Sequence, residues 1–213
     1  MKKIVLAFSL LVFCSVALFA QAPKDILDKA ASAITQNGGV SVDFSIKSSN
    51  SKSKSGVMSQ SGKAWIKGNK FKLVSSEGTT WFDGKTQWTY VKANNEVNVS
   101  NPDGEELAGI SPVSILGLYK SGFKLDNKGV GSDRGRAVYK IEMTPQKKNS
   151  SVNKYIVNID RQNYQITSIT LNSRNGNNVV IVLQKYQTGQ NLSDKTFVFE
   201  KKEYPRAEIV DLR

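Results

Sequence analysis

The side chains that could do acid–base chemistry in this chain are few, and the promising ones are carboxylates. The 213 residues contain no His and a single Cys, Cys14, so the chain alone cannot form a Ser-His-Asp triad, a Cys-His pair or a His-ligated metal site. A glycosidase needs only two carboxyl groups, and Asp83, Asp103, Glu105 and Glu106 are candidates. Both aspartates precede Gly, where Asp normally serves the turn itself, and both glutamates lie in a polar loop. We therefore expect no enzymatic activity, no metal and no cofactor.

The first twenty residues have the pattern of an export signal. Two lysines precede a largely apolar run over residues 4–19, which is short for a membrane span, and Ala20 follows it. We predict a signal peptide over residues 1–20 that is removed by cleavage near Ala20, and one mature domain over residues 21–213.

A lipoprotein signal is the alternative for this segment, because residues 11–14 resemble a lipobox. The bulky Phe13 directly before Cys14 argues against it. The mature domain would contain no cysteine and therefore no disulfide.

Charge is spread evenly along the mature chain. The formal net charge is +12, or +10 without the two lysines of the signal peptide, and residues 21–100 and 101–213 contribute +5 each. A nucleic-acid footprint would be a concentrated patch, so we expect no nucleic-acid partner.

One local exception lies between Asp43 and Glu77, where the chain has seven lysines and no acid. They are Lys47, Lys52, Lys54, Lys63, Lys67, Lys70 and Lys72. The favoured interpretation is a solvated sheet edge that resists aggregation; the alternative is attraction to an anionic membrane surface or an acidic partner.

The elements that would position a site are mostly strands. Apolar residues at helical spacing over 26–34 predict one helix that ends at Asn37-Gly38-Gly39. Hydrophobic alternation from Val40 onward predicts strands, with tight turns at Asp83-Gly84 and Asn175-Gly176. The expected strands are near 40–46, 57–67, 69–75, 79–83, 85–92, 95–100, 122–130, 136–144, 152–161, 164–173, 178–187 and 195–200.

A short apolar helix should interrupt these strands. Ser111 is its expected cap and Pro112 lies in its first turn; Val113, Ile115, Leu116, Leu118 and Tyr119 follow. The sequence therefore predicts a mainly β fold: a single strongly curved antiparallel sheet of about 11 strands, an open or incomplete β-barrel, with an N-terminal helix and a short lid helix. A sheet curved around so small a helix leaves either an ordinary core or an apolar cavity for a ligand.

Three segments carry a family resemblance. Residues 60–71 contain Gly62-Lys-Ala-Trp65, residues 82–90 contain Asp83-Gly-Lys followed by Trp88-Thr-Tyr90, and residues 96–99 read Glu-Val-Asn-Val. Their order, and the Val-Asp-Leu-Arg ending, resemble the LolA-type periplasmic carriers of outer-membrane lipoproteins. By element order the resemblance extends over most of the mature chain.

The resemblance implies a monomeric periplasmic carrier whose apolar concave face holds the acyl chains of lipoproteins. Its partners would be acylated lipoproteins, an inner-membrane ABC-type lipoprotein release complex that loads it and, if one exists, an outer-membrane acceptor. The expected cavity wall is Trp65, Phe71, Leu73, Trp81, Trp88, Tyr90, Val97 and Val99, and the expected lid contacts are Ile115, Leu116 and Leu118.

One departure affects the lid. The classical carriers have Arg-Pro where this chain has Gly68-Asn69, and that arginine helps to hold the lid. Lys67 and Lys70 lie nearby but lack the planar, multi-donor geometry of arginine. Two other functions stay open: an envelope sensor or general lipid-binding module of the same fold, and a structural β protein whose cavity is filled.

Overall fold

The computed structural model describes residues 21–213, except 36–37, 51–56, 105, 108–113 and 121. The predicted signal peptide, Glu105 and the predicted helix start at Ser111, Pro112 and Val113 lie outside the described residues. No helix in the described part of the chain has the length and apolar run needed to cross a bilayer.

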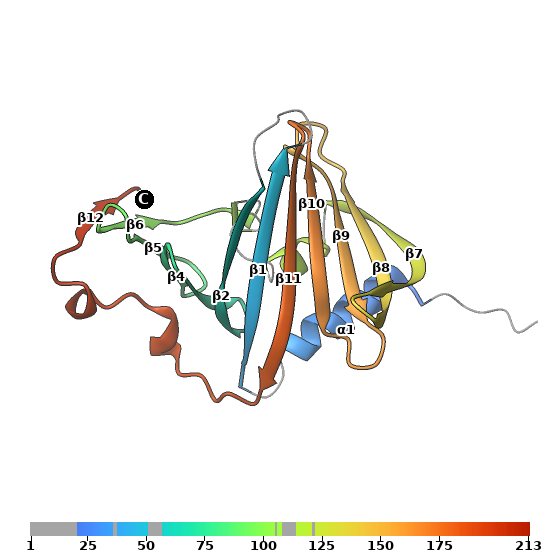
Figure 1. Cartoon of the computed structure of the whole chain (residues 1–213), viewed down its shortest axis with the longest axis horizontal. Helices are drawn as coiled ribbons and strands as arrows, with labels where there is room; N and C mark the ends of the chain where they lie inside the picture. The colour runs from blue at the N-terminus through green and yellow to red at the C-terminus, as the bar shows by residue number, and fades with distance from the viewer. Residues whose placement is uncertain (1–20, 36–37, 51–56, 105, 108–113, 121) are drawn as a thin grey trace, which may run out of the picture.

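Twelve strands form one open sheet, which confirms the predicted fold class (Figure 1). The sheet order is β12-β6-β5-β4-β3-β2-β1-β11-β10-β9-β8-β7. Neighbours are antiparallel, except that β12 runs parallel to β6. The strands are β1 (Val40–Asn50), β2 (Met58–Lys67), β3 (Lys70–Ser75), β4 (Gly78–Phe82), β5 (Gln87–Val91), β6 (Glu96–Ser100), β7 (Phe123–Asp133), β8 (Arg136–Pro145), β9 (Val152–Asp160), β10 (Ile166–Ser173), β11 (Asn177–Thr188) and β12 (Glu208–Asp211).

Strand β1 lies near the centre of the sheet and joins its two halves. It pairs with β2, which follows it in sequence, and with β11, which lies far along the chain. Strands β7 and β12 form the two edges, so the curved sheet is not closed into a barrel.

Helix α1 (Pro23–Thr35) packs across the concave side of this sheet, which we call the helix face. Its first residue is Pro23, whose fixed φ suits that position, and Asp25 in the first turn complements the helix dipole. Four side chains spaced for one helix face are buried against the sheet: Ile26, Leu27, Ala30 and Ile34. The helix predicted from the apolar spacing is confirmed. The second helix, α3 (Ile115–Leu118), also lies on the helix face, where Ile115 and Leu116 join the core that α1 covers.

The C-terminal segment, residues 189–213, differs from the prediction. A strand was expected at 195–200, but the chain forms two short 3-10 helices, η1 (Asp194–Phe197) and η2 (Lys201–Glu203), before strand β12. The Ser193 hydroxyl accepts a hydrogen bond from the Lys195 N–H and starts η1. In Figure 1 this segment runs along the outside of the β2–β6 half and returns beside β6.

Candidate functional site

A mainly apolar hollow lies on the helix face, between the C-terminal half of α1, the β2–β3 turn and α3. Its volume is about 420 Å³, within the range of small-molecule sites. Ala31 and Ile34 line it from α1, and Leu116 and Leu118 line it from α3. We call it the main hollow.

The floor of the main hollow is a row of cross-strand partners. Val40 pairs with Ile66, Ile66 with Phe71, and Phe71 with Phe82, and the last three line the hollow. The Phe71 and Phe82 ring centroids are 5.2 Å apart with planes 28° from parallel, a stacked arrangement that adds about 0.5–1.5 kcal/mol beyond burial. The floor is therefore rigid and apolar.

A second hollow of about 250 Å³ lies on the same face of the sheet. Leu73, two residues beyond Phe71, lines it together with Thr80 and Thr89, and residues two apart on a strand share a face. Thr80 Oγ1 and Thr89 Oγ1 are 3.5 Å apart, so this part is more polar. We call the two hollows together the trough.

A polar contact fixes α3 to α1 beside the main hollow. The Tyr119 hydroxyl donates to Asp28 Oδ1, and Lys24 Nζ donates to Asp28 Oδ2 at 2.7 Å. The hydrogen bonds from Lys24 and then Tyr119 lower the pKa of Asp28. Burial, and then the Asp28 hydrogen bond, raise the pKa of Tyr119.

The two lysines beside the Gly68-Asn69 turn hold a different element. Lys67 Nζ and Lys70 Nζ lie 3.1 and 3.0 Å from the two carboxylate oxygens of Asp194, and Lys67 also donates to the Leu192 carbonyl at 2.8 Å. They anchor the C-terminal segment to the sheet, while Gly68 and Asn69 line the main hollow.

Three of the predicted wall and lid residues line the main hollow, namely Phe71, Leu116 and Leu118, and two more, Leu73 and Tyr90, are among the residues that line the second hollow. Ile115 is fully buried in the core under α1 and does not line either hollow.

Five predicted wall residues, Tyr90 among them, pack their side chains on the opposite face of the sheet, which we call the tail face. Trp81 pairs with Trp88, and Trp88 with Val99, so the three share a face. The Trp81 ring is 5.6 Å from the Phe199 and Tyr204 rings of the C-terminal segment, and Tyr90 is 4.6 Å from Tyr204. Val97 joins the same cluster. These residues pack against the C-terminal segment.

Trp65 also lies on the tail face, because it alternates with the buried Ala64 and Ile66. The Lys63 ammonium is 5.5 Å from its ring centroid, and Lys72 is similarly placed over Trp81. Lysines therefore mark the tail face on β2 and β3.

The sequence prediction did not include several residues that line the main hollow, although the sequence pattern marks some of them. Ile66 and Phe82 stand at the apolar positions that alternate with lysine or with the tail-face tryptophans. Ala31 and Ile34 belong to the apolar face of the predicted helix. Nothing local marks Leu107, which reaches the hollow from the segment before α3.

Together these features define a class of protein: an open antiparallel sheet with helices across its concave face and an apolar hollow between them. The family model described as outer membrane lipoprotein carrier protein LolA matches residues 13–177. The chain belongs to this family.

Solved structures share the fold at low sequence identity. An uncharacterized conserved protein from Thermus thermophilus is 11% identical over 90% of this chain and 99% of that chain, with a TM-score of 0.59. A DUF1329 family protein from Desulfovibrio piger is 12% identical over 83% and 95% of the two chains, with a TM-score of 0.50. A LolA superfamily protein from Nitrosomonas europaea is 13% identical over 84% and 99%, with a TM-score of 0.49. No curated protein matches the chain in sequence.

Proposed function

We propose that this protein is a periplasmic carrier that binds the acyl chains of lipoproteins in the trough and shuttles them from the inner to the outer membrane. An inner-membrane ABC-type release complex would load it, and an outer-membrane acceptor would unload it. The observation that carries the proposal is the main hollow, an apolar space of about 420 Å³ on the helix face of a chain in the lipoprotein carrier family.

The energetics of such cargo favour an open trough over a closed pocket. Each buried methylene contributes about 0.8 kcal/mol, so a lipoprotein anchor with roughly forty methylenes would need on the order of 30 kcal/mol of shielding. Non-covalent affinity saturates near about −20 kcal/mol. A carrier must therefore cover the chains in part and accept them from a machine that does work.

The test is native mass spectrometry of protein purified from the cell envelope without detergent. We expect bound acylated peptide or lipoprotein. The variant Ala31→Trp places an indole in the main hollow and should reduce the bound acylated species. The matched control is Ala33→Trp, which makes the same change on the same helix at a residue that does not line either hollow.

Three results would contradict the proposal. Free phospholipid without acylated peptide would indicate a general lipid binder or an envelope sensor. A protein that is empty and ignores hydrophobic dyes would indicate a filled core. Equal loss of cargo in Ala31→Trp and Ala33→Trp would place the cargo outside the main hollow.

A further inference from the structure

Three connections of the sheet join strand ends at one end of the molecule, where β1 finishes. The register pairs Asn50 of β1 with Asn177 of β11, and Ser173 of β10 with Val152 of β9. The strand ends that the β1–β2, β8–β9 and β10–β11 connections join therefore lie side by side, at the top of the sheet in Figure 1. We define the loop end by its described residues: Lys47, 57–58, 146–151 and 174–176.

The loop end carries charge of one sign. Asp and Glu are absent from residues 44–76, 143–159 and 161–193, the stretches that contain all three connections. The nearest acid on β8, Glu142, pairs with Lys154 at 2.9 Å. The exposed cations of the loop end are Lys47, Lys147, Lys148 and Arg174.

Two large apolar side chains stand exposed beside these cations. Val57 is 66% exposed and Met58 is 75% exposed, and Met58 has the highest exposure among the large apolar side chains of the described residues. Met58 pairs with Ser48 and so lies on the helix face, two residues before Gln60, which lines the second hollow. An acidic protein would match the cations alone, whereas a bilayer offers both anionic headgroups and an apolar interior.

We propose that the loop end docks on the surface of an anionic phospholipid bilayer. The cations would contact the headgroups, and Val57 and Met58 would enter the interface. Docking in this way brings the part of the helix face next to the second hollow nearest to the lipid. The proposal goes beyond the carrier function and does not require acyl cargo.

The test is flotation with vesicles of phosphatidylcholine mixed with phosphatidylglycerol, compared with phosphatidylcholine alone. We expect binding to the mixed vesicles that weakens as salt is raised. Each cation near an anionic surface contributes about fivefold in partitioning. The double variant Lys47→Glu with Lys148→Glu should therefore reduce binding by at least about 25-fold.

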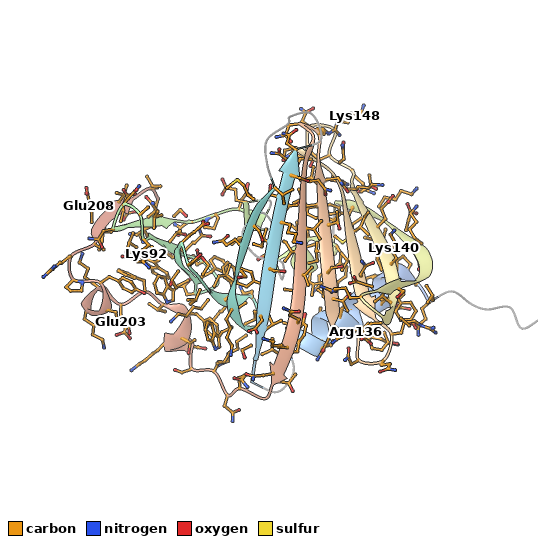
Figure 2. All side chains as sticks on the ribbon, viewed as in Figure 1. Lys92, Arg136, Lys140, Lys148, Glu203 and Glu208 are labelled. Atoms are coloured by element: carbon orange, nitrogen blue, oxygen red, sulfur yellow. The ribbon has the colours of Figure 1, made fainter. Side chains whose placement is uncertain are left out.

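The matched control is Lys92→Glu with Lys140→Glu, which changes the net charge equally at two exposed lysines away from the loop end; Figure 2 shows Lys92, Lys140 and Lys148. All variants keep the same N-terminus, so any contribution from that segment is common to them. If the two double variants lost vesicle binding equally, the effect would come from net charge alone, and the proposal would be overturned. Equal binding to neutral vesicles would also overturn it.

The apolar component is tested separately. Val57→Ser with Met58→Ser should weaken binding to the mixed vesicles, and Val130→Ser with Ile209→Ser, two exposed apolar residues elsewhere, should not. If polyglutamate binds the loop end while the mixed vesicles do not, the partner is an acidic protein and the bilayer proposal is wrong.

Discussion

Gly62 is a residue at which the sheet has no room for a side chain. A Cβ there would come within 2.0 Å of the Val74 carbonyl oxygen and 2.7 Å of Phe44 Cζ. The first neighbour is backbone and cannot move without distorting β3. We expect Gly62→Ala to lower the free energy of unfolding by about 3 kcal/mol, measured by denaturant titration.

The control for Gly62→Ala is Gly131→Ala. A Cβ at Gly131 in β7 has no neighbour within 4 Å, so the change should be close to neutral or stabilise by up to about 1 kcal/mol through the unfolded state. Similar losses in the two variants would show that the Phe44 ring and the Val74 backbone do not set the cost.

The Tyr119–Asp28 hydrogen bond makes the α1–α3 contact sensitive to pH. The pKa of Asp28 is lowered, so its contribution is present above about pH 4 and is lost as the pH falls below that value. The pKa of Tyr119 is raised, so its contribution is present below about pH 10 and is lost as the pH rises further. Stability should therefore decline on both sides of this window.

Tyr119→Phe tests this pH dependence. At neutral pH we expect a loss of about 1.5 kcal/mol, because the acceptor is charged but stays partly solvated. The alkaline decline should become smaller without disappearing, since burial also raises the pKa of Tyr186. Thermal unfolding at a series of pH values measures both effects. If stability declined at high pH to the same extent in Tyr119→Phe as in the unmodified protein, Tyr119 would not contribute to that decline.

The positions of the lysines show how far the sequence alone could assign side chains to the two faces of the sheet. On β2, Lys63 and Lys67 share the parity of Trp65, and on β3, Lys72 alternates with Phe71. Alternation therefore indicated that Trp65 lies opposite Phe71. The eight wall candidates were grouped by their apolar or aromatic character, which ignores that period of two. Register between strands, which decides the faces of β4 to β6, follows from turn geometry and from the partners of each strand.

At the scale of elements, the C-terminal segment explains why so many aromatics are on the tail face. Phe197 and Phe199 are two residues apart, as on one face of a strand, and a strand was expected at 195–200. The chain instead turns through η1 and η2, because the aromatic side chains pack onto Trp81 and Tyr90. That contact joins residues distant in sequence, so no local pattern could reveal it. Strands β1 to β11, by contrast, carry their own alternation and turns, and their predicted positions are confirmed, whereas β12 was not predicted.

Tyr204 is the residue that ties the C-terminal segment to the tail face. Its ring contacts Trp81, Tyr90 and Phe199. We expect Tyr204→Ala to lower stability by about 2–3 kcal/mol and to increase hydrogen exchange in β12. Tyr204→Phe keeps the ring contacts and should retain most of the stability.

The variant Tyr204→Ala also tests which face of the sheet binds acyl chains. Tyr204 lines neither hollow, so folded Tyr204→Ala protein should bind an acylated peptide with affinity close to that of the unmodified protein. Measured by fluorescence titration, a large loss of affinity in a protein that remains folded would place the acyl site on the tail face.

At the scale of the whole molecule, the two faces of the sheet are covered to different extents. The tail face is closed by the C-terminal segment, whose ion pairs to Lys67 and Lys70 fix its start. The helix face is covered by α1 and α3 only in part, which leaves the trough. The floor residues Ile66, Phe71 and Phe82 belong to the same buried core as Ile141 and Ile159 of the other half, so the trough lies directly on the core.

The two hollows should act as one site whose length limits the acyl chain. In a series of acylated peptides, affinity for the unmodified protein should rise by about fourfold per added methylene, from about 0.8 kcal/mol each, until the trough is filled. Ala31→Trp fills the main hollow but leaves the second, so affinity should stop rising at a shorter chain. Ala33→Trp should match the unmodified protein throughout. An unchanged limit in Ala31→Trp would mean that the chain lies in the second hollow alone, because a continuous trough shortened at one end must hold fewer methylenes.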